Sequence, residues 1–376
     1  MSPDATPAAR PVLTGLGVLS ACGSGLGPLT AAAGHGKTAF STVARFDVSR
    51  RGTRRAALLP GPLRLADAVL DVIGDACRQA GLPEGPEPAE EHPIPLLLAL
   101  HSDLSTRAAA AEVAAGAAAG WGVPGVTRVY TGACVAAGTA VADAAALVAS
   151  GRHPRVLVAA GHLVEPGVFA AFDAGRALAR DGELRPFSAG RTGTLLGDAA
   201  AAVVIEAEAA AAGRGVPVLA RLAGWGRSGD AYHVCRPVPD GEGVARAAES
   251  ALARAGVEPA EVGYVNANGT GSPLADRAEA IALRRVFGAH TDRLPVSSSK
   301  AVHGHALEAS ALLELAVTVG ALQSGLLPVN AGWLGRDEDV GLDLVLDGPR
   351  EARPRYALSL NSAFGGANTA LLVAAR

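Results

Sequence analysis

Cys134 is the residue of this chain best placed to act as a nucleophile. It stands in RVYTGACVAAGTA, residues 128–140, where an extended run gives way to an alanine-rich helical pattern. A thiol at a helix N-terminus meets the positive end of the helix dipole and unpaired N–H groups, and both favour the thiolate. Its own backbone N–H can also help to bind an oxyanion. The alternative is a small buried residue, which is our interpretation of Cys22, Cys77 and Cys235.

Two further segments could supply polar chemistry. In YVNANGTGSPL, residues 264–274, Asn268 opens a loop of glycines and hydroxyls after a short apolar run. Its amide can donate a hydrogen bond but cannot take up or release a proton. In SSSKAVHGH, residues 297–305, Lys300 is one of only two lysines in a chain with 33 lysines and arginines. A lysine kept against that bias indicates a site that needs an ammonium group.

The elements that must position these residues are strands alternating with helices. Strands are predicted at residues 11–19, 154–162, 200–207, 262–267, 355–361 and 369–375, and helices at 63–81, 134–151, 243–256 and 306–325. This alternation indicates βαβ units and a mostly buried parallel sheet. Both halves show this alternation of strands and helices, which is compatible with an internal duplication split near residue 210.

Bulk composition excludes several classes of protein. The chain has 376 residues, 49% of them hydrophobic, and can bury a large core. Its net charge of −3 argues against a nucleic-acid partner. Neither a secretory signal nor an apolar run of about 18 to 20 residues is found, so we expect a cytoplasmic protein without a membrane span. The four cysteines lack metal-like spacing, so we expect free thiols and no metal.

Ordered motifs over nearly the whole chain resemble the β-ketoacyl synthase (ketosynthase) family, of thiolase fold. GACVAAG (132–138) looks like the family's nucleophile elbow. The match continues with RPFSAGRTGTLLGDAAAAVVIE (185–206), DAYHVCRPVPDGEG (230–243), NANGTGSPLADRAEA (266–280), SSSKAVHGHALEASALLE (297–314) and NSAFGGANTALL (361–372). The resemblance implies an α/β, five-layered αβαβα fold built from two similar βαβ-rich halves. We place a flexible N-terminus at 1–10, the half with the nucleophile at 11–210 and the half with the His/Lys and oxyanion loop at 211–376.

The resemblance also implies roles along the acyl path. Cys134 would accept an acyl group as a thioester, with the backbone N–H groups of Cys134 and Phe364 holding the oxyanion. Phe364 would also gate the acyl pocket, and Phe172 would line the substrate site. Thr270 and Ser272 match the hydroxyls that contact the phosphopantetheine arm of an acyl carrier protein. No other organic group and no metal is implied.

A second set of residues would support the nucleophile. His305 stands at the position of the family's second active-site histidine, within hydrogen-bond reach of Cys134. Lys300 and Glu314 would form a buried ionic support beneath it. His303, two residues before His305, could place another imidazole in the site, but alternate residues on a turn tend to point apart and we expect it at the surface.

Asn268 departs from the family, which carries a histidine in an H-G-T-G-T pattern. The loss of acid–base capacity removes a contribution typically on the order of 10²–10⁴-fold. Decarboxylative condensation is therefore predicted to be impaired, whereas acyl loading at Cys134 need not suffer equally. Asn268 and His305 would still provide two donors to an enolate oxygen. The segment from Leu96 to Thr131 also looks shorter than in typical relatives, which affects the predicted pocket and the predicted dimer interface.

Three functions are compatible with these features. The first is a ketosynthase-type acyltransferase working through Cys134 in fatty-acid-like or polyketide assembly, with an acyl carrier protein as partner. The second is a non-catalytic, chain-length-factor-like subunit that pairs with an active ketosynthase. Either would form a homodimer or a heterodimer with a ketosynthase-type subunit. The third, an unrelated α/β hydrolase using Cys134, lacks a G-x-S/C-x-G elbow. We favour the first.

Overall fold

The computed structural model describes residues 9–61, 63–87 and 93–376. The predicted flexible N-terminus at 1–10 lies outside the described residues apart from Ala9 and Arg10. The backbone N–H of Ala9 donates to the carbonyl of Ala149, 3.2 Å away. Arg10 directly precedes the first strand.

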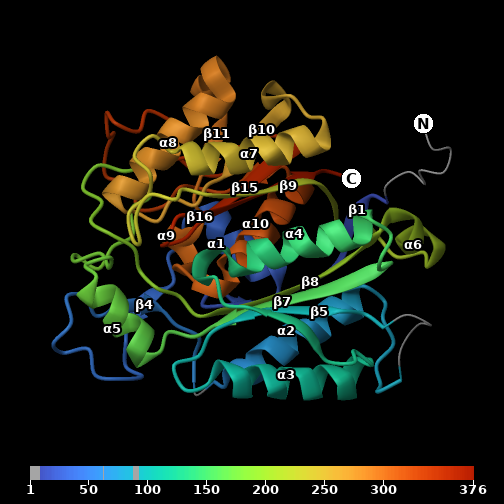
Figure 1. The fold of residues 1–376 in the computed structure, drawn as a ribbon. Helices are drawn as coiled ribbons and strands as arrows, with labels where there is room; N and C mark the ends of the chain where they lie inside the picture. Colours follow the sequence, from blue (N-terminus) through green and yellow to red (C-terminus); the bar gives the residue numbers. More distant parts are fainter. Residues whose placement is uncertain (1–8, 62, 88–92) are drawn as a thin grey trace.

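One continuous sheet runs through the molecule, and its strand order repeats (Figure 1). The first part of the sheet has the order β6 (Val126–Tyr130), β5 (Leu96–Leu100), β7 (Arg155–His162), β8 (Ala199–Ala207), β1 (Pro11–Ser20). The second part continues with β9 (Ala220–Gly229), β16 (Ala367–Ala374), β15 (Tyr356–Ser362), β10 (Val262–Asn266), β11 (Pro295–Ser297) and β13 (Asp343–Leu344). The outer strands are parallel, namely β6, β5 and β7 in the first part and β13, β11, β10 and β15 in the second. The inner strands β8, β1, β9 and β16 are antiparallel to their neighbours, so the predicted parallel sheet is found only in the outer strands.

Helices divide the molecule into layers (Figure 1). The helices α2 (Leu65–Gln79) and α3 (Thr106–Trp121) cover the outer face of the first part of the sheet, and α7 (Glu242–Ala255) and α8 (Pro273–Phe287) cover that of the second. Between the two parts lie α4 (Ala136–Ala149) and α10 (Ser310–Ser324), which contact strands of both. The order helix, sheet, helix, sheet, helix confirms the predicted five-layered α/β fold.

Shorter elements complete the described chain. They are β2 (Gly23–Ser24), α1 (Leu26–His35), β3 (Phe40–Thr42), β4 (Arg55–Ala57), α5 (Pro166–Ala174), α6 (Glu208–Gly213), α9 (Lys300–His303), β12 (Leu326–Leu327) and β14 (Arg350–Glu351), with 3₁₀ turns η1 (Ala133–Val135), η2 (Pro259–Glu261), η3 (Gly288–Arg293) and η4 (Leu307–Ala309). Three of these carry residues of the predicted site: Cys134 lies in η1, Phe172 in α5 and Lys300 in α9.

The central helices are short of polar residues because both of their sides are buried. In α10 every residue from Ser310 to Ala321 is buried, and α4 buries mainly alanine and valine. The outer helices approach the sheet closely at glycines of β1 and β9. A Cβ at Gly17 would lie 1.9 Å from the carbonyl oxygen of Val72 in α2, and one at Gly226 would lie 1.9 Å from that of Ala247 in α7. Only glycine therefore fits at these two contacts.

Candidate active site

The nucleophile turn is a strained connection between β6 and α4. Ala133, the residue before Cys134, has φ 48°, which a non-glycine residue adopts only when its surroundings impose it. The turn forms the 3₁₀ segment η1, and α4 begins two residues after Cys134. The Cys134 side chain is 5% exposed and faces a cavity of about 670 Å³. The strain directs the thiol into this cavity.

His305 is the nearest polar partner of the thiol. Its Nε2 atom lies 3.0 Å from the Cys134 Sγ atom, and its Nδ1 atom lies 2.9 Å from the Ser310 hydroxyl. Ser310 also accepts a hydrogen bond from the Ala306 N–H. Because a hydroxyl can donate or accept, Ser310 can support either neutral tautomer of the imidazole. His305 can therefore accept the thiol proton through Nε2 or present an Nε2–H donor.

Burial keeps both members of this pair neutral at rest. It raises the pKa of the Cys134 thiol to about 12, and the carboxylate of Glu308 adds to that rise while Lys300 opposes it. Burial, followed by the charge of Lys300, holds the pKa of His305 well below its usual value. The helix N-terminus favours the thiolate, whereas burial opposes it. Because burial raises the pKa of the thiol, proton transfer should accompany attack.

Beneath His305 lies a buried ion pair. The Lys300 Nζ atom is 2.6 Å from the Glu314 Oε1 atom, and both side chains are fully buried. Asn361 donates a hydrogen bond of 2.6 Å to the other carboxylate oxygen of Glu314. The structure thus brings Lys300 and Glu314 together. The positive charge helps to keep His305 neutral.

His303 does not reach the cavity. It is fully buried, so the expectation of a surface residue is wrong. Its Nδ1 atom lies 2.7 Å from the Gly304 carbonyl, and its Nε2 atom lies 3.0 Å from the Ser299 hydroxyl. Since the carbonyl only accepts, the ring carries its proton on Nδ1. Both nitrogens are engaged away from the cavity, so His303 offers no second imidazole to the site.

Asn268 lines the same cavity as Cys134 and His305. It is 4% exposed, and its side-chain oxygen has no hydrogen-bond partner. The loop that holds it is fixed by Glu279 in α8, whose carboxylate accepts the N–H groups of Asn268 at 2.7 Å and Gly269 at 2.8 Å. A Cβ at Gly269 would lie 2.6 Å from that of Ser298, which explains the glycine after Asn268.

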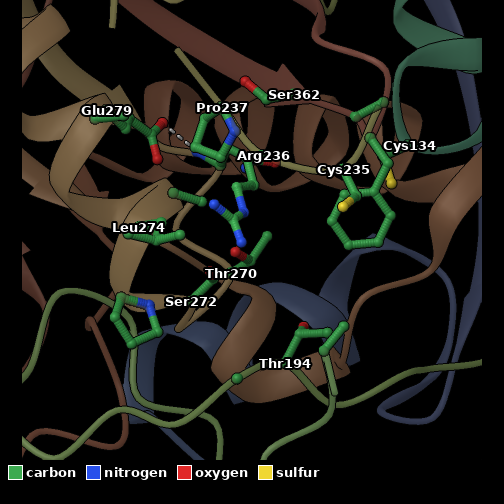
Figure 2. Close-up of a pocket in the computed structure, with 18 of the residues that line it drawn as sticks. Cys134, Thr194, Cys235, Arg236, Pro237, Thr270, Ser272, Leu274, Glu279 and Ser362 are labelled. Atoms are coloured by element: carbon green, nitrogen blue, oxygen red, sulfur yellow. Dashed lines mark hydrogen bonds between the residues drawn. The ribbon is translucent and has the colours of Figure 1, made fainter. Parts of the chain in front are cut away.

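The other predicted site residues also line the cavity. Figure 2 shows Thr270 and Ser272 on one side of it and Cys134 on another. Phe364 lies in the turn between β15 and β16, is 54% exposed, and packs on Phe172 with ring centroids 5.6 Å apart. Both rings line the cavity. The structure thus gathers around one cavity all the residues predicted to touch substrate.

Several polar residues near the site escaped the sequence analysis. His162, at the end of β7, faces Glu308 in η4 with 3.6 Å between Nδ1 and Oε2, and both side chains are buried. Neither ring nitrogen of His162 has a hydrogen-bond partner among the described residues. Ser310 and Arg236 were also not singled out. Glu308, an acidic residue three positions after His305, was the one sequence feature that could have pointed to a further polar group at this site.

Neither a metal centre nor a membrane span is found in the part of the chain that the structure describes. Within residues 9–61, 63–87 and 93–376, no group of three or more His, Cys, Asp or Glu side chains could hold a metal ion. In the same ranges no helix has the length and hydropathy needed to cross a bilayer.

The chain matches two protein-family models. A model described as "Beta-ketoacyl synthase, N-terminal domain" matches residues 99–211, and one described as "Beta-ketoacyl synthase, C-terminal domain" matches residues 219–333. Together they span more than half of the chain. Cys134, Asn268, Lys300 and His305 fall inside these ranges, and Phe364 falls outside.

Individual relatives cover part of the chain. Nodulation protein E of Rhizobium meliloti is 39% identical over 253 residues, which are 66% of this chain and 62% of the relative. The 3-oxoacyl-[acyl-carrier-protein] synthase 2 of Coxiella burnetii is 39% identical over 50% of this chain and 46% of its own length. The chain therefore spans less than two thirds of these curated relatives.

A solved structure matches almost the whole fold. The ishigamide ketosynthase/chain length factor superposes with a TM-score of 0.88 over 98% of this chain and 100% of the other, at 26% sequence identity. At 98% coverage, this match extends beyond the residues that the two domain models cover.

Proposed function

Because this chain belongs to the beta-ketoacyl synthase family, we propose that it is an acyltransferase that carries acyl groups as a thioester on Cys134. The observation that carries the proposal is the 3.0 Å contact between Cys134 Sγ and His305 Nε2 at the wall of a cavity. A nucleophile and a base within hydrogen-bond reach form the basic unit of covalent acyl transfer. The acyl groups would belong to fatty-acid-like or polyketide assembly.

Loading begins with a neutral thiol. As the Cys134 sulfur attacks the thioester carbonyl, His305 Nε2 takes the thiol proton, a new C–S bond forms, and the bond to the departing thiol breaks. The departing thiol leaves with that proton. The backbone N–H groups of Cys134 and Phe364 would stabilise the oxyanion formed in between. No metal or organic cofactor takes part.

The acyl group would arrive on the phosphopantetheine arm of an acyl carrier protein. Thr270 and Ser272 stand where hydroxyls could bind that arm, on the cavity wall seen in Figure 2. The name of the Coxiella relative includes such a carrier as its substrate. We propose a cytoplasmic enzyme that pairs with itself or with a second ketosynthase-type subunit.

Condensation would be the weaker activity. It requires an enolate formed from a malonyl thioester as carbon dioxide leaves, and a titrating side chain would assist that step. Asn268 can donate to the enolate oxygen and His305 can add a second donor. Neither restores the proton-transfer capacity that the asparagine lacks, so we propose that the enzyme loads acyl groups faster than it extends them.

A second candidate is a non-catalytic, chain-length-factor-like subunit. Asn268 favours it, and the matched ishigamide structure is described as a ketosynthase/chain length factor. The contact between Cys134 and His305 argues against it, because a passive subunit needs neither group in this geometry.

Intact-mass spectrometry separates the two candidates. The protein is incubated with acyl-loaded carrier protein beside a Cys134→Ala variant, alone and with a partner ketosynthase, and is then chased with malonyl carrier protein. We expect one acyl adduct on the wild type and none on the variant, with slow conversion to a 3-oxoacyl product. Absence of the adduct under both conditions would falsify the catalytic proposal and support the subunit. Matching adducts on Cys134→Ala and wild type would also contradict it.

A further inference from the structure

Arg236 brings a positive charge into the active-site cavity. It lies in the loop between β9 and α7, and Figure 2 shows its side chain extending into the cavity toward Thr270. Within the part of the chain that the structure describes, the guanidinium makes neither an ion pair nor a hydrogen bond. Arg236 is an exposed residue on the cavity wall, so its fork is accessible both to solvent and to a ligand that enters the cavity.

The carboxylates of the same cavity are already engaged. Asp230 accepts hydrogen bonds from the Asn368 amide at 2.7 Å and from the Val238 N–H at 3.1 Å. Glu279 holds the backbone of the Asn268 loop. Neither forms an ion pair with Arg236. The charge of the guanidinium is therefore compensated by no carboxylate that lines the cavity.

The loop of Arg236 is tied to the turn that contains Phe364. The Gly365 N–H donates to the Val234 carbonyl at 2.9 Å, and the Asp230 N–H donates to the Gly366 carbonyl at 2.8 Å. A Cβ at Gly366 would lie 2.7 Å from that of Asp230, so the two segments pack tightly. Arg236 thus belongs to the same wall as the turn proposed to hold the reacting carbonyl.

The other polar groups nearby are the Asn268 amide, whose oxygen has no hydrogen-bond partner, and hydroxyls that can donate or accept. Asn268 presents its amide to the cavity, and the Thr270 and Ser272 hydroxyls share it. A guanidinium surrounded by amide and hydroxyl donors, in a cavity whose walls are mostly apolar, fits a ligand with an anionic oxygen group on an apolar chain.

We propose that Arg236 recognises a free carboxylate on the acyl group, so that the enzyme selects dicarboxylic acyl thioesters. This rests on the proposed function, because the acyl group reaches the cavity on its way to Cys134. An arginine that pairs with the carboxylate stabilises the substrate before decarboxylation, and that interaction is lost when carbon dioxide leaves. Arg236 therefore favours transfer of the intact carboxyacyl group. The phosphate of the carrier arm shares this chemistry and is distinguished below.

Loading rates on Cys134 test the selection. The substrates are the N-acetylcysteamine thioester of glutarate and its neutral amide, glutaramate, which match in size and contain no phosphate. We expect the wild type to load the glutaryl group at least tenfold faster. Arg236→Gln should load both within twofold, and Arg236→Lys should keep part of the preference. Arg176→Gln, which removes another arginine of the same cavity wall, is the matched control and should keep it all.

Three results would overturn the proposal. They are equal loading of the two groups by the wild type, a preference that survives Arg236→Gln, and an equal loss of preference in Arg176→Gln. Delivery of the acyl group on an acyl carrier protein distinguishes recognition of the carboxylate from recognition of the phosphate of the arm. If Arg236→Gln slows both groups equally there and leaves the N-acetylcysteamine reactions unchanged, the anion is the phosphate of the arm and the carboxylate proposal is wrong.

Measuring the binding of an acyl analogue that cannot be transferred tests this inference independently of the proposed function. Calorimetry on Cys134→Ala uses the glutaryl and glutaramoyl amides of aminopantetheine, which cannot acylate the protein. We expect at least tenfold tighter binding of the glutaryl compound, lost in Cys134→Ala/Arg236→Gln. Equal binding overturns the inference even if Cys134 is acylated. Absence of any Cys134 adduct, with the binding preference intact, overturns the proposed function alone.

Discussion

The two halves of the molecule share a strand order but differ in the turn that enters the central helix. In the first half β6 ends at Tyr130 and α4 begins at Ala136, so the turn is confined to residues 131–135. In the second half β11 ends at Ser297 and α10 begins at Ser310, and residues 298–309 fold into α9 and η4. The short turn holds one thiol, and the long turn holds a cation and two imidazoles.

This difference shows how the same arrangement of strands and helices places different functional groups in the two halves. The short turn leaves room only for a nucleophile at the start of its helix. The long turn can bury Lys300 against Glu314 and still bring His305 to the thiol. The connection between the two antiparallel inner strands shows the reverse. It is long between β7 and β8 and includes α5, whereas residues 363–366 suffice between β15 and β16.

Asn268→His would test whether the second half lacks only one titrating group. Because Asn268 makes no side-chain hydrogen bond through its oxygen, the substitution breaks no such contact. We expect 3-oxoacyl formation to rise about 10²–10⁴-fold relative to acyl loading, as a general acid–base group is restored. Product is measured by mass spectrometry of the carrier protein. Asn268→Gln is the control, and an equal gain in that variant would show that proton transfer is not the limiting factor.

Lys300→Met would remove the charge on which the long turn is built. It leaves the fully buried Glu314 carboxylate without its cation, which should cost about 3–5 kcal/mol of unfolding free energy. Urea unfolding followed by circular dichroism measures the change.

The double variant Lys300→Met/Glu314→Gln should recover most of this loss, because it leaves no buried charge. A loss below about 1 kcal/mol in the single variant would mean that the turn is held by packing rather than by the ion pair.

His303→Asn would show how the long turn responds to acid. Burial lowers the pKa of His303 to about 3, below the value of about 6.5 expected for the unfolded chain. The unfolded state therefore binds more protons between pH 6.5 and 3, and His303 reduces stability as the pH falls through that window. At pH 4.5 this amounts to roughly 2–3 kcal/mol.

The variant should therefore lose roughly 2–3 kcal/mol less than the wild type between pH 7 and pH 4.5 in urea unfolding. The difference between two pH values matters here, because the lost hydrogen bonds of His303 affect both equally. Parallel pH profiles would mean that His303 is protonated within the fold.

Glu308→Gln would test the influence of the second half on the nucleophile of the first. The carboxylate raises the pKa of the Cys134 thiol, so its removal should increase the thiolate fraction. We expect iodoacetamide to alkylate Cys134 about 3- to 10-fold faster at pH 8, because one pKa unit changes the thiolate fraction tenfold. Peptide mapping separates Cys134 from Cys235, which is exposed, so the expectation of a buried Cys235 is wrong. A slower reaction would instead indicate that Glu308 helps to remove the thiol proton.

Regular elements were predictable from the sequence where apolar periodicity is strong. The strands at β1, β7, β8, β10, β15 and β16 and the helices α2, α4, α7 and α10 lie within a few residues of their predicted bounds. β9 was missed because its glycines, among them Gly224 and Gly226, interrupt the apolar run, although they fit against α7. No helix was predicted at α3, which lies within the segment from Leu96 to Thr131 that looked short.

The site was predictable where residue type determines the chemistry. Cys134, His305, Lys300 and Glu314 belong to motifs that place them near one another, and the structure brings them together. The protonation states were not predictable, because they depend on burial. The place of His303 likewise depended on hydrogen bonds to Ser299 and Gly304 that no spacing reveals.

Cys134 and His305 each precede one of the two central helices, and those helices touch where a Cβ at Gly138 would lie 3.3 Å from that of Ala311. The distance between the Cys134 sulfur and the His305 imidazole therefore depends on how closely α4 and α10, and so the two halves, pack against each other. Heat or denaturant that slightly separates α4 from α10 would abolish the proposed acyl transfer at Cys134 while the secondary structure is still intact. Loss of the proposed acyl transfer should therefore be detectable at a lower temperature or denaturant concentration than loss of secondary structure.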